Sequence, residues 1–367
     1  MEGSMEKRAK YQEISKWLKE RIALGEYEAG DKIPSEHELS RVFSVSRQTA
    51  RHAVGLLQEE GVVKRTRGSG TYIARNYIPQ KKEKTMRIQL ILTYIDEYIF
   101  PAMIKAVEKA VYAHGYTLQV AFTNNLIEKE ESLVRGLMRE RNADAVIVEP
   151  SKSGIPNPNI PLYRKLLLES KIPVVFVNSW YPSVEAPHVC LNDRETGEVI
   201  TRHLIQCGHT EIGGIFKLDD GQGRRRYEGY VKAILEAGLR INSKHIVWYD
   251  TEDAKYMEKE PERYLRGMRG CTACVCYNDQ IALKLMKICQ ERGIRIPEEL
   301  SIVGVDNSRL AAQAGISLTT AENQVELLGK RAGEMIVDMI ENRSRPASVE
   351  LSPRLIIRKS VRTAYQA

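Results

Sequence analysis

Residues 30–61 read GDKIPSEHELSRVFSVSRQTARHAVGLLQEEG, and this stretch decides the fold of the N-terminal part of the chain. Ser35 and Glu38 have the spacing of a helix-capping box, which predicts a helix over 35–43. A second serine then has the position of an N-cap for a helix over 46–60. Two helices joined by so short a link are typical of a helix-turn-helix.

The segments on either side extend this motif. Upstream, apolar side chains recur every three or four residues over 11–24, which predicts an amphipathic helix. Downstream, VVKRTRGSGTYIA reads as two short strands, 62–66 and 71–74, around a glycine-containing turn. A hairpin that directly follows a helix-turn-helix forms a wing, so we expect an N-terminal winged helix-turn-helix.

The outer face of the predicted 46–60 helix carries groups that suit a polyanion. Arg47 and Arg51 lie one turn apart, where like charges repel each other unless a partner neutralises them. Arginine can pair with guanine and glutamine with adenine in the major groove, and the basic wing can reach phosphates. A solvated charged face is the alternative for the helix alone. The residues we expect on DNA from this chemistry are Arg47, Gln48, Arg51, Lys64, Arg65 and Arg67.

The positive charge of the chain is concentrated in the same region. The net charge is +7 overall, and residues 1–84 contribute +5 of it, with 17 Lys and Arg against 12 Asp and Glu. Between Ser46 and Lys84 there are nine basic and three acidic residues. Such a local excess is the distribution expected of a nucleic-acid footprint.

The motifs IPSEHELS (33–40), VSRQTAR (45–51), EEGVV (59–63) and RGSGTY (67–72) resemble the GntR family of bacterial regulators over residues 11–74. In that family the operator is contacted from the second helix, the start of the recognition helix and the wing tip. The resemblance therefore implies double-stranded operator DNA as a partner. The positions that it implies on DNA are His37, Ser46, Arg47, Thr49, Arg51, Arg67 and Gly68.

Length and composition bound the rest of the chain. At 367 residues, 43% hydrophobic and 28% charged, it is long enough for two or three globular domains. The N-terminus lacks the apolar core of a signal peptide, and no apolar run is long enough for a membrane span, so we expect a cytoplasmic protein without membrane association. The six cysteines suggest buried structural thiols, with neither a disulfide framework nor a metal site.

A polar, basic segment without periodicity, residues 75–85, is predicted as a linker between domains 1–74 and 86–367. Beyond it, short apolar runs alternate with amphipathic helices, which predicts α/β architecture with doubly wound parallel sheets. About ten strands exceed one compact sheet, so we expect two lobes. The runs are IQLIL, LQVAF, AVIVE, VVFVN, IGGIF, HIVWY, ACVCY and SIVGV.

Polar side chains follow these strands directly. Ligands of open α/β sheets bind beyond the carboxyl ends of the strands, so we expect these side chains to line one cleft. Carboxylates suit hydroxyl donors, and tyrosine rings suit the apolar face of a sugar. Simpler roles remain open, because Asp219, Asp220 and Asp279 can cap helices and Lys217 can be solvated. The effector-binding candidates from this pattern are Tyr94, Tyr98, Glu149, Lys217, Asp219, Asp220, Gln222, Asn278 and Asp306.

Catalysis is not expected. The chain contains no HExxH, GxSxG, Walker A or complete GxGxxG motif in the required context. Lys217 beside carboxylates could in principle form a Schiff base, but the sequence indicates neither a cofactor nor a catalytic residue.

CYNDQIALKLM (276–286), IPEELSIVGVDNS (296–308) and SLTT (317–320) resemble the LacI/GalR regulators and periplasmic sugar-binding proteins over residues 87–360. This resemblance implies a two-lobed, periplasmic-binding-protein-like fold that also mediates dimerisation, with Asn278 and Asp306 as ligand contacts. It implies that Asn323, in the segment that crosses between lobes, lines the same cleft. It also implies an arginine in the cleft, although the choice among Arg224, Arg225 and Arg226 stays open.

A GntR-type head on a LacI/GalR-type body, with strings such as TYIDEYIFP, IVEPSKS and GIFKLDDGQG, resembles the arabinose-responsive repressors of Gram-positive bacteria. The resemblance implies L-arabinose as the effector, a homodimer on a palindromic operator, and release of DNA when the sugar binds. The residues alone indicate only a small polyhydroxylated ligand. A regulator of the same architecture that activates, or that responds to another sugar or a nucleoside, is the alternative.

Overall fold

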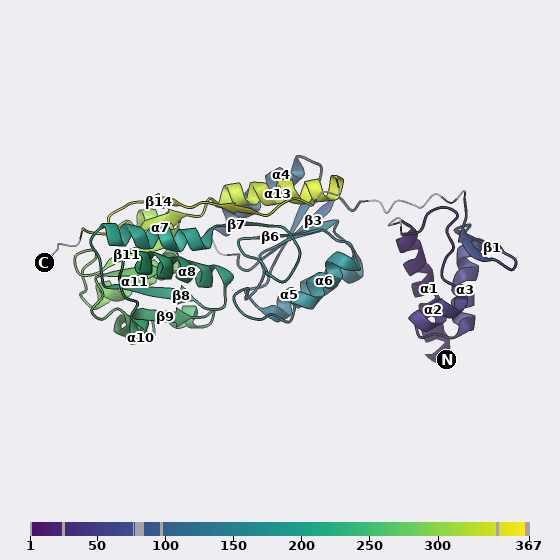
Figure 1. The fold of residues 1–367 in the computed structure, drawn as a ribbon, viewed down its shortest axis with the longest axis horizontal. Helices are drawn as coiled ribbons and strands as arrows, with labels where there is room; N and C mark the ends of the chain where they lie inside the picture. The colour runs from purple at the N-terminus through teal and green to yellow at the C-terminus, as the bar shows by residue number, and fades with distance from the viewer. Residues whose placement is uncertain are drawn as a thin grey trace. The chain divides into compact units, whose positions relative to one another are not determined.

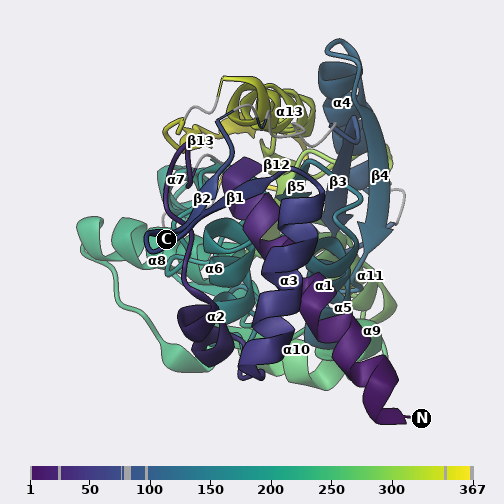
Figure 2. The ribbon, with the colours of Figure 1, turned by 90° about the vertical axis from the view of Figure 1, so that its right-hand side faces the viewer.

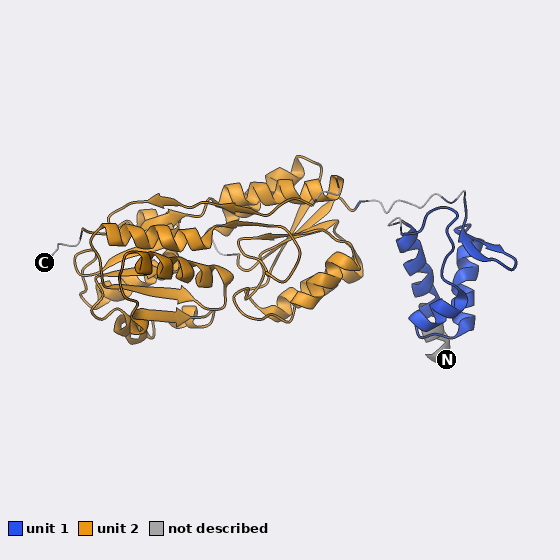
Figure 3. Ribbon diagram, viewed as in Figure 1, with its two compact units in different colours: residues 1–84 blue, residues 85–367 orange. Residues whose placement is uncertain are grey.

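A computed structural model describes residues 2–23, 26–75, 77, 84–95, 98–342 and 345–363. The chain divides into two compact units, Met1–Lys84 and Thr85–Ala367 (Figure 3). Most of the predicted linker, 75–85, lies outside the described residues.

The first unit is a winged helix-turn-helix, as predicted. Its elements are α1 (Glu2–Ala23), α2 (Glu36–Val42), α3 (Arg47–Glu59), β1 (Val63–Thr66) and β2 (Gly70–Ile73). The α1 helix begins nine residues before the predicted start, and β1 and β2 form an antiparallel hairpin.

The predicted caps explain why the two central helices begin where they do. The backbone N–H of Ser35 donates to the Glu38 carboxylate at 2.7 Å, and the N–H of Glu38 donates to the Ser35 hydroxyl, so the capping box is complete. The Ser46 hydroxyl accepts from the N–H of Thr49 at 3.1 Å. Leu18, Leu39 and Leu57, one from each helix, are fully buried in the shared core.

The second unit contains two lobes, each built around a six-stranded sheet (Figure 1). The first lobe has the strand order β13-β7-β6-β5-β3-β4. Its elements are β3 (Arg87–Leu92), α4 (Phe100–Tyr112), β4 (Thr117–Phe122), α5 (Ile127–Glu140), β5 (Ala145–Val148), α6 (Ile160–Leu168), β6 (Val174–Val177), β7 (His188–Leu191), α13 (Val325–Glu341) and β13 (Val349–Leu351).

The second lobe has the order β14-β12-β11-β10-β8-β9, and only β14 runs antiparallel to its neighbour. Its elements are α7 (Asp193–Gln206), β8 (Ile212–Lys217), α8 (Gly221–Glu236), a 3₁₀ turn (Ser243–His245), β9 (Ile246–Tyr249), α9 (Asp253–Tyr256), α10 (Pro261–Gly267), β10 (Ala273–Cys276), α11 (Asp279–Glu291), β11 (Ser301–Asp306), α12 (Arg309–Gln313), β12 (Thr319–Glu322) and β14 (Arg354–Ile356).

The chain passes between the lobes three times. The crossings follow β7, β12 and β13, and the second of them returns α13 to the first lobe. There α13 packs along α4, as both views show (Figures 1 and 2). The two sheets therefore share one junction, towards which the carboxyl ends of their parallel strands point.

The eight predicted apolar runs all form strands, which confirms the α/β prediction. Strands β5, β6, β8, β10 and β11 are buried along their whole length, as expected for parallel strands covered by helices on both faces. Within the described residues, no helix has the length and apolarity to cross a membrane. Cys271, Cys274 and Cys276 lie in the apolar core of the second lobe.

Candidate functional site

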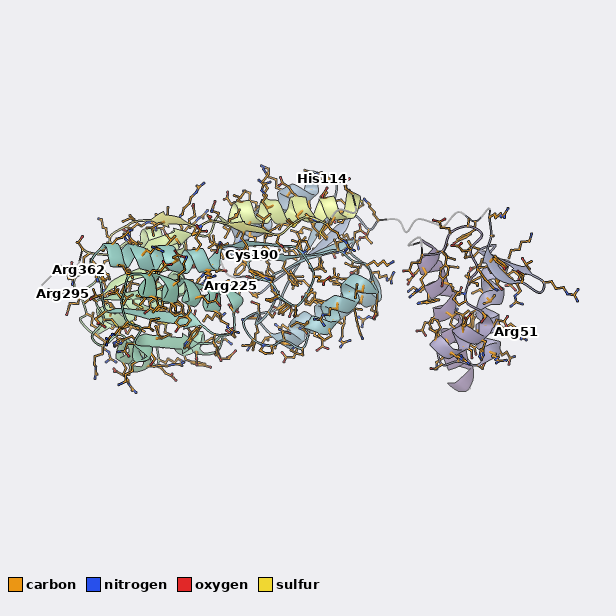
Figure 4. The ribbon with its side chains drawn as sticks, in the orientation of Figure 1. Arg51, His114, Cys190, Arg225, Arg295 and Arg362 are labelled. Carbon is orange, nitrogen blue, oxygen red and sulfur yellow. The ribbon has the colours of Figure 1, made fainter. Side chains whose placement is uncertain are left out.

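The exposed surface of the first unit brings α2, α3 and the wing together. Arg51 of α3 donates from Nε to Glu36 Oε2 at 3.0 Å, and Arg65 of the wing pairs with the other oxygen of the same carboxylate. Arg47 Nη2 lies 2.9 Å from His37 Nδ1. Glu36 therefore holds two arginines of this surface in place, and the sequence analysis did not identify it. Figure 4 labels one of these arginines, Arg51.

The remaining head residues fall into two groups. The hydroxyls of Ser46 and Thr49 are 2.8 Å apart, so both take part in the cap of α3. The others project from the start of α3 or from the wing without burial, and Gly68 adopts a positive φ of 75° in the turn between the strands. These exposed residues are Gln48, Lys64, Arg67 and Gly68.

A cavity of about 420 Å³ lies between the lobes of the second unit, which is within the usual size range for small-molecule sites. Side chains that follow the carboxyl ends of strands from both sheets line it. Nine of the ten predicted effector-binding residues are among them: Tyr94, Tyr98, Glu149, Lys217, Asp220, Gln222, Asn278, Asp306 and Asn323.

Lys217 and Asp220 form a buried ion pair in this cavity. Lys217 Nζ lies 2.7 Å from Asp220 Oδ2, and the Tyr277 hydroxyl donates to the same oxygen at 3.2 Å. Burial alone would lower the pKa of Lys217, but Asp220, Tyr94 and Asp219 together outweigh it and raise the pKa. The lysine is therefore charged and paired, so it is neither solvated nor poised as a nucleophile.

Asp219 is the predicted residue that the cavity lining does not include. Its Oδ2 accepts hydrogen bonds from the backbone N–H and the hydroxyl of Thr251, at 3.2 and 2.7 Å. Its carboxylate therefore braces the loop that follows β9, and Thr251 itself lines the cavity.

Asp306 joins the two lobes at the end of β11. The Tyr98 hydroxyl donates to its Oδ2 at 2.5 Å, and the amide of Asn323 donates to its Oδ1 at 3.0 Å. Burial raises the pKa of Asp306 to about 6, although Arg226 and these two donors oppose the shift. Its backbone φ of 115° is a strained value for a residue with a side chain, and such strain concentrates at ligand sites.

Glu149 is held at the end of β5 in the first lobe. The N–H of Thr93 donates to it at 2.9 Å, the Thr93 hydroxyl binds the same oxygen, and Asn178 donates to the other oxygen at 3.0 Å. Burial raises the pKa of Glu149. These contacts hold both carboxylate oxygens of Glu149 at the wall of the cavity.

The open choice among three arginines is resolved by their contacts. Arg226 is the one that lines the cavity, and it donates to Asp193 Oδ1 at 2.8 Å and to the carbonyl oxygen of Tyr277 at 2.6 Å. Arg224 instead donates to the Gly154 carbonyl oxygen. Arg225 lies over the Trp180 ring at 3.8 Å, where the two lobes meet (Figure 4).

The contacts of Asn278 and Asp279 show that the alternative role of Asp279 as a helix cap is wrong. Asn278, and not Asp279, caps α11, because its Oδ1 accepts from the N–H of Ile281. Asp279 is fully buried and accepts from the Ser308 N–H and the Thr320 hydroxyl, at 2.8 and 2.6 Å.

Three buried acceptors on the cavity lining have no hydrogen-bond partner within the described part of the chain. They are Asn178 Oδ1, Asp193 Oδ2 and Asn323 Oδ1. Buried acceptors without hydrogen bonds are costly, so three of them on residues around one cavity mark a place where a ligand or ordered water can supply donors. Asn178 followed a predicted strand, but Asp193 was missed because its strand, β7, was missed.

Two family models match the chain. One, described as bacterial regulatory proteins of the gntR family, matches residues 10–73, and one described as a periplasmic binding protein-like domain matches residues 201–361. Among solved structures, the transcription regulator CcpA of Lactococcus lactis superimposes with a TM-score of 0.66 at 24% identity, over 75% of this chain and 98% of that one. This likeness shows the fold.

Full-length relatives are more informative. The chain is 38% identical to the arabinose metabolism transcriptional repressor of Halalkalibacterium halodurans, over 97% of both chains. It is 36% identical to the repressor of the same name from Geobacillus stearothermophilus, over 96% of both chains. With a GntR-type head, a periplasmic-binding-like body and relatives that are repressors and not enzymes, this chain belongs to the family of arabinose metabolism transcriptional repressors.

Proposed function

We propose that this sugar-responsive transcriptional repressor takes L-arabinose as its effector and releases its operator when the sugar binds. The observation that carries the sugar assignment is that three acceptors on residues around one cavity, Asn178 Oδ1, Asp193 Oδ2 and Asn323 Oδ1, lack a hydrogen bond within the described part of the chain. A polyhydroxylated ligand supplies several donors at once. The names of the full-length relatives favour arabinose among such ligands.

The charges of the cavity support a neutral ligand. Its two deepest cations, Lys217 and Arg226, are each paired with a carboxylate of the same lining, Asp220 and Asp193. A phosphorylated ligand would have to displace these carboxylates or rely on Lys255 and Lys284, the other two lysines of the lining. A sugar needs neither.

The ten head residues named above are proposed to hold the operator. Arg47 and Arg51 would read base edges from the start of α3, while Lys64, Arg65 and Arg67 would hold phosphates or the minor groove. A symmetric homodimer would place two recognition helices on the half-sites of a palindromic operator. Cytoplasmic residence follows from this role as an expectation.

Calorimetry on the full chain tests the effector. L-arabinose, D-xylose, D-galactose and a nucleoside are titrated separately under the same conditions. Saturable binding of L-arabinose, at least tenfold tighter than the others, is the expected result. Binding of another ligand in its place would keep the repressor but overturn arabinose as its effector.

A further inference from the structure

A second set of contacts joins the lobes at the edge of the cavity, and we name it the clasp. It consists of Asn125 and residues 152–154 of the first lobe, and of residues 218–221 and Arg224 of the second lobe. The N–H of Gly154 donates to the Asp219 carbonyl oxygen at 3.0 Å, and the N–H of Gly221 donates to the Ser153 hydroxyl at 3.0 Å. Arg224 Nη1 donates to the Gly154 carbonyl oxygen at 2.5 Å.

Asn125 is the buried centre of the clasp. Its Oδ1 accepts from the N–H of Lys152 at 2.7 Å in its own lobe. Its Nδ2 donates across the junction to Asp220 Oδ1 at 3.1 Å and to the Thr251 hydroxyl at 2.7 Å. The side chain is completely buried, so each of these bonds is made without competing water.

Gly154 sets how closely the two lobes approach. A β-carbon added there would lie 2.6 Å from the Leu218 carbonyl oxygen and 2.8 Å from that of Asp220, both in the second lobe. These are backbone atoms at the edge of the cavity, so they cannot turn away as a flexible side chain would. Gly154 is not among the residues with positive φ, so alanine there meets an obstacle only when the lobes are together.

The clasp acts on the cavity through Asp220. Asn125 holds one oxygen of this carboxylate, while Lys217 and Tyr277 hold the other. Asp220, Lys217 and Tyr277 line the cavity, whereas Asn125 and Gly154 do not. The orientation of an effector-site carboxylate therefore depends on residues of the opposite lobe that do not line the cavity.

We propose that Asn125 and Gly154 are positioning residues for the effector response: the clasp forms only when the lobes close, and it then aligns Asp220 for the ligand. The measured free energy of effector binding then includes the free energy of forming the clasp. Weakening the clasp lowers the population of the binding-competent state, and the apparent affinity falls by the same factor. This inference rests on the sugar response described above, and its test is separable from the identity of the sugar.

The experiment compares Gly154→Ala with the wild type in the full chain. Gly136→Ala is the matched control, because a β-carbon at Gly136, in α5 of the same lobe, would meet nothing within 4 Å. L-arabinose affinity is measured by calorimetry, and hydrogen exchange of segments 151–155 and 218–222 is measured with and without the sugar. We expect Gly154→Ala to bind the sugar about tenfold more weakly, with faster exchange in both segments.

Each outcome of this experiment either supports or overturns the clasp. Unchanged affinity together with unchanged exchange in Gly154→Ala overturns the clasp. If the wild type does not bind L-arabinose, the proposed effector is wrong, and the clasp is tested by hydrogen exchange without sugar. Faster exchange of both segments in Gly154→Ala than in the wild type then supports the clasp, and equal exchange overturns it. Equal thermal stability of the variants without sugar separates a weakened clasp from a misfolded lobe.

Arg224→Ala provides a second variant. Its side chain is exposed and makes one bond of the clasp, so this change leaves the fold intact. We expect a smaller loss of sugar affinity than in Gly154→Ala, about threefold for one hydrogen bond from an exposed side chain, and faster exchange in residues 151–155. Wild-type values for both readouts would contradict the clasp.

Discussion

The hydroxyl of Tyr98 and the carboxylate of Asp306 lie 2.5 Å apart and connect the two lobes across the cavity. Tyr98 precedes α4 in the first lobe, and Asp306 ends β11 in the second. Asn323, in a segment that crosses between the lobes, holds the other oxygen of the same carboxylate. A ligand that binds Asp306 therefore engages both lobes and one of their connections at once.

Replacing Asp306 tests this connection. Asp306→Ala removes the acceptor shared by Tyr98 and Asn323, so we expect the sugar response to be lost, while operator affinity without sugar stays at the wild-type value. Operator binding with and without sugar measures both. Glu131→Ala, at a half-buried position of α5 outside the cavity lining, serves as the control. Release of Asp306→Ala by sugar at the wild-type concentration would refute the role of Asp306.

The pH dependence of effector binding follows from the same carboxylate. Burial raises the pKa of Asp306 to about 6, and in the proposed complex sugar hydroxyls would donate to its ionised form. Binding therefore favours loss of the proton, so affinity is full above about pH 7 and weakens as the pH falls through about 6. Calorimetry between pH 5 and pH 8 checks this direction. Affinity that improves towards low pH would be inconsistent with an ionised Asp306 in the complex.

Arg47 provides the test of the DNA-binding surface. It is exposed at the first position of α3, where its guanidinium contacts His37. If it reads a guanine, Arg47→Ala costs about 1–3 kcal/mol in operator binding and relaxes specificity at one position. Fluorescence anisotropy with a labelled operator measures this loss. Arg135→Ala in the second unit is the control, and equal affinities of the two variants would exclude base reading by Arg47.

Close packing of α7 on α8 leads to a prediction about stability. A β-carbon at Gly229 would lie 1.9 Å from the carbonyl oxygen of Arg194, which is backbone and cannot yield cheaply. Gly229→Ala is therefore expected to lower the free energy of unfolding by about 1–3 kcal/mol or more. Urea denaturation against Gly136→Ala measures it. A variant as stable as the Gly136→Ala control would show that the helices separate without cost.

Much of the fold was predictable because local signals agree with it. The capping box at Ser35 and Glu38 and the N-cap at Ser46 fixed the starts of two helices to within a residue. Apolar runs marked eight strands, five of which are buried along their whole length, whereas β4 is not. The number of predicted strands led to the expectation of two lobes, and the family resemblance implied the same arrangement.

Four strands were missed for physical reasons. HVCL (188–191) and TTAE (319–322) are short and partly polar, and the three-residue strands β13 and β14 depend on pairing with distant segments. Their periodicity is too brief to indicate a strand. Missing β7 also concealed Asp193, which is the partner of Arg226 in the cavity.

The site was predictable in position but not in detail. Position after a strand identified most of the lining, but it could not separate Asp220, which faces the cavity, from Asp219, which braces Thr251. Neighbouring residues in a turn point in different directions, and only tertiary contacts decide which of them faces the ligand. The same limit applied to Arg224, Arg225 and Arg226, and to Glu36, whose role depends on two arginines distant in sequence.

The effect of L-arabinose on operator binding tests the account most directly. The full chain first selects its operator from a pool of random duplexes, and the labelled duplex is then titrated with the chain at fixed ionic strength, with and without saturating sugar. We predict that L-arabinose lowers operator affinity at least tenfold, within the usual range of coupling between two sites, and that D-xylose does not. Operator affinity that is unchanged or increased by L-arabinose would contradict the account.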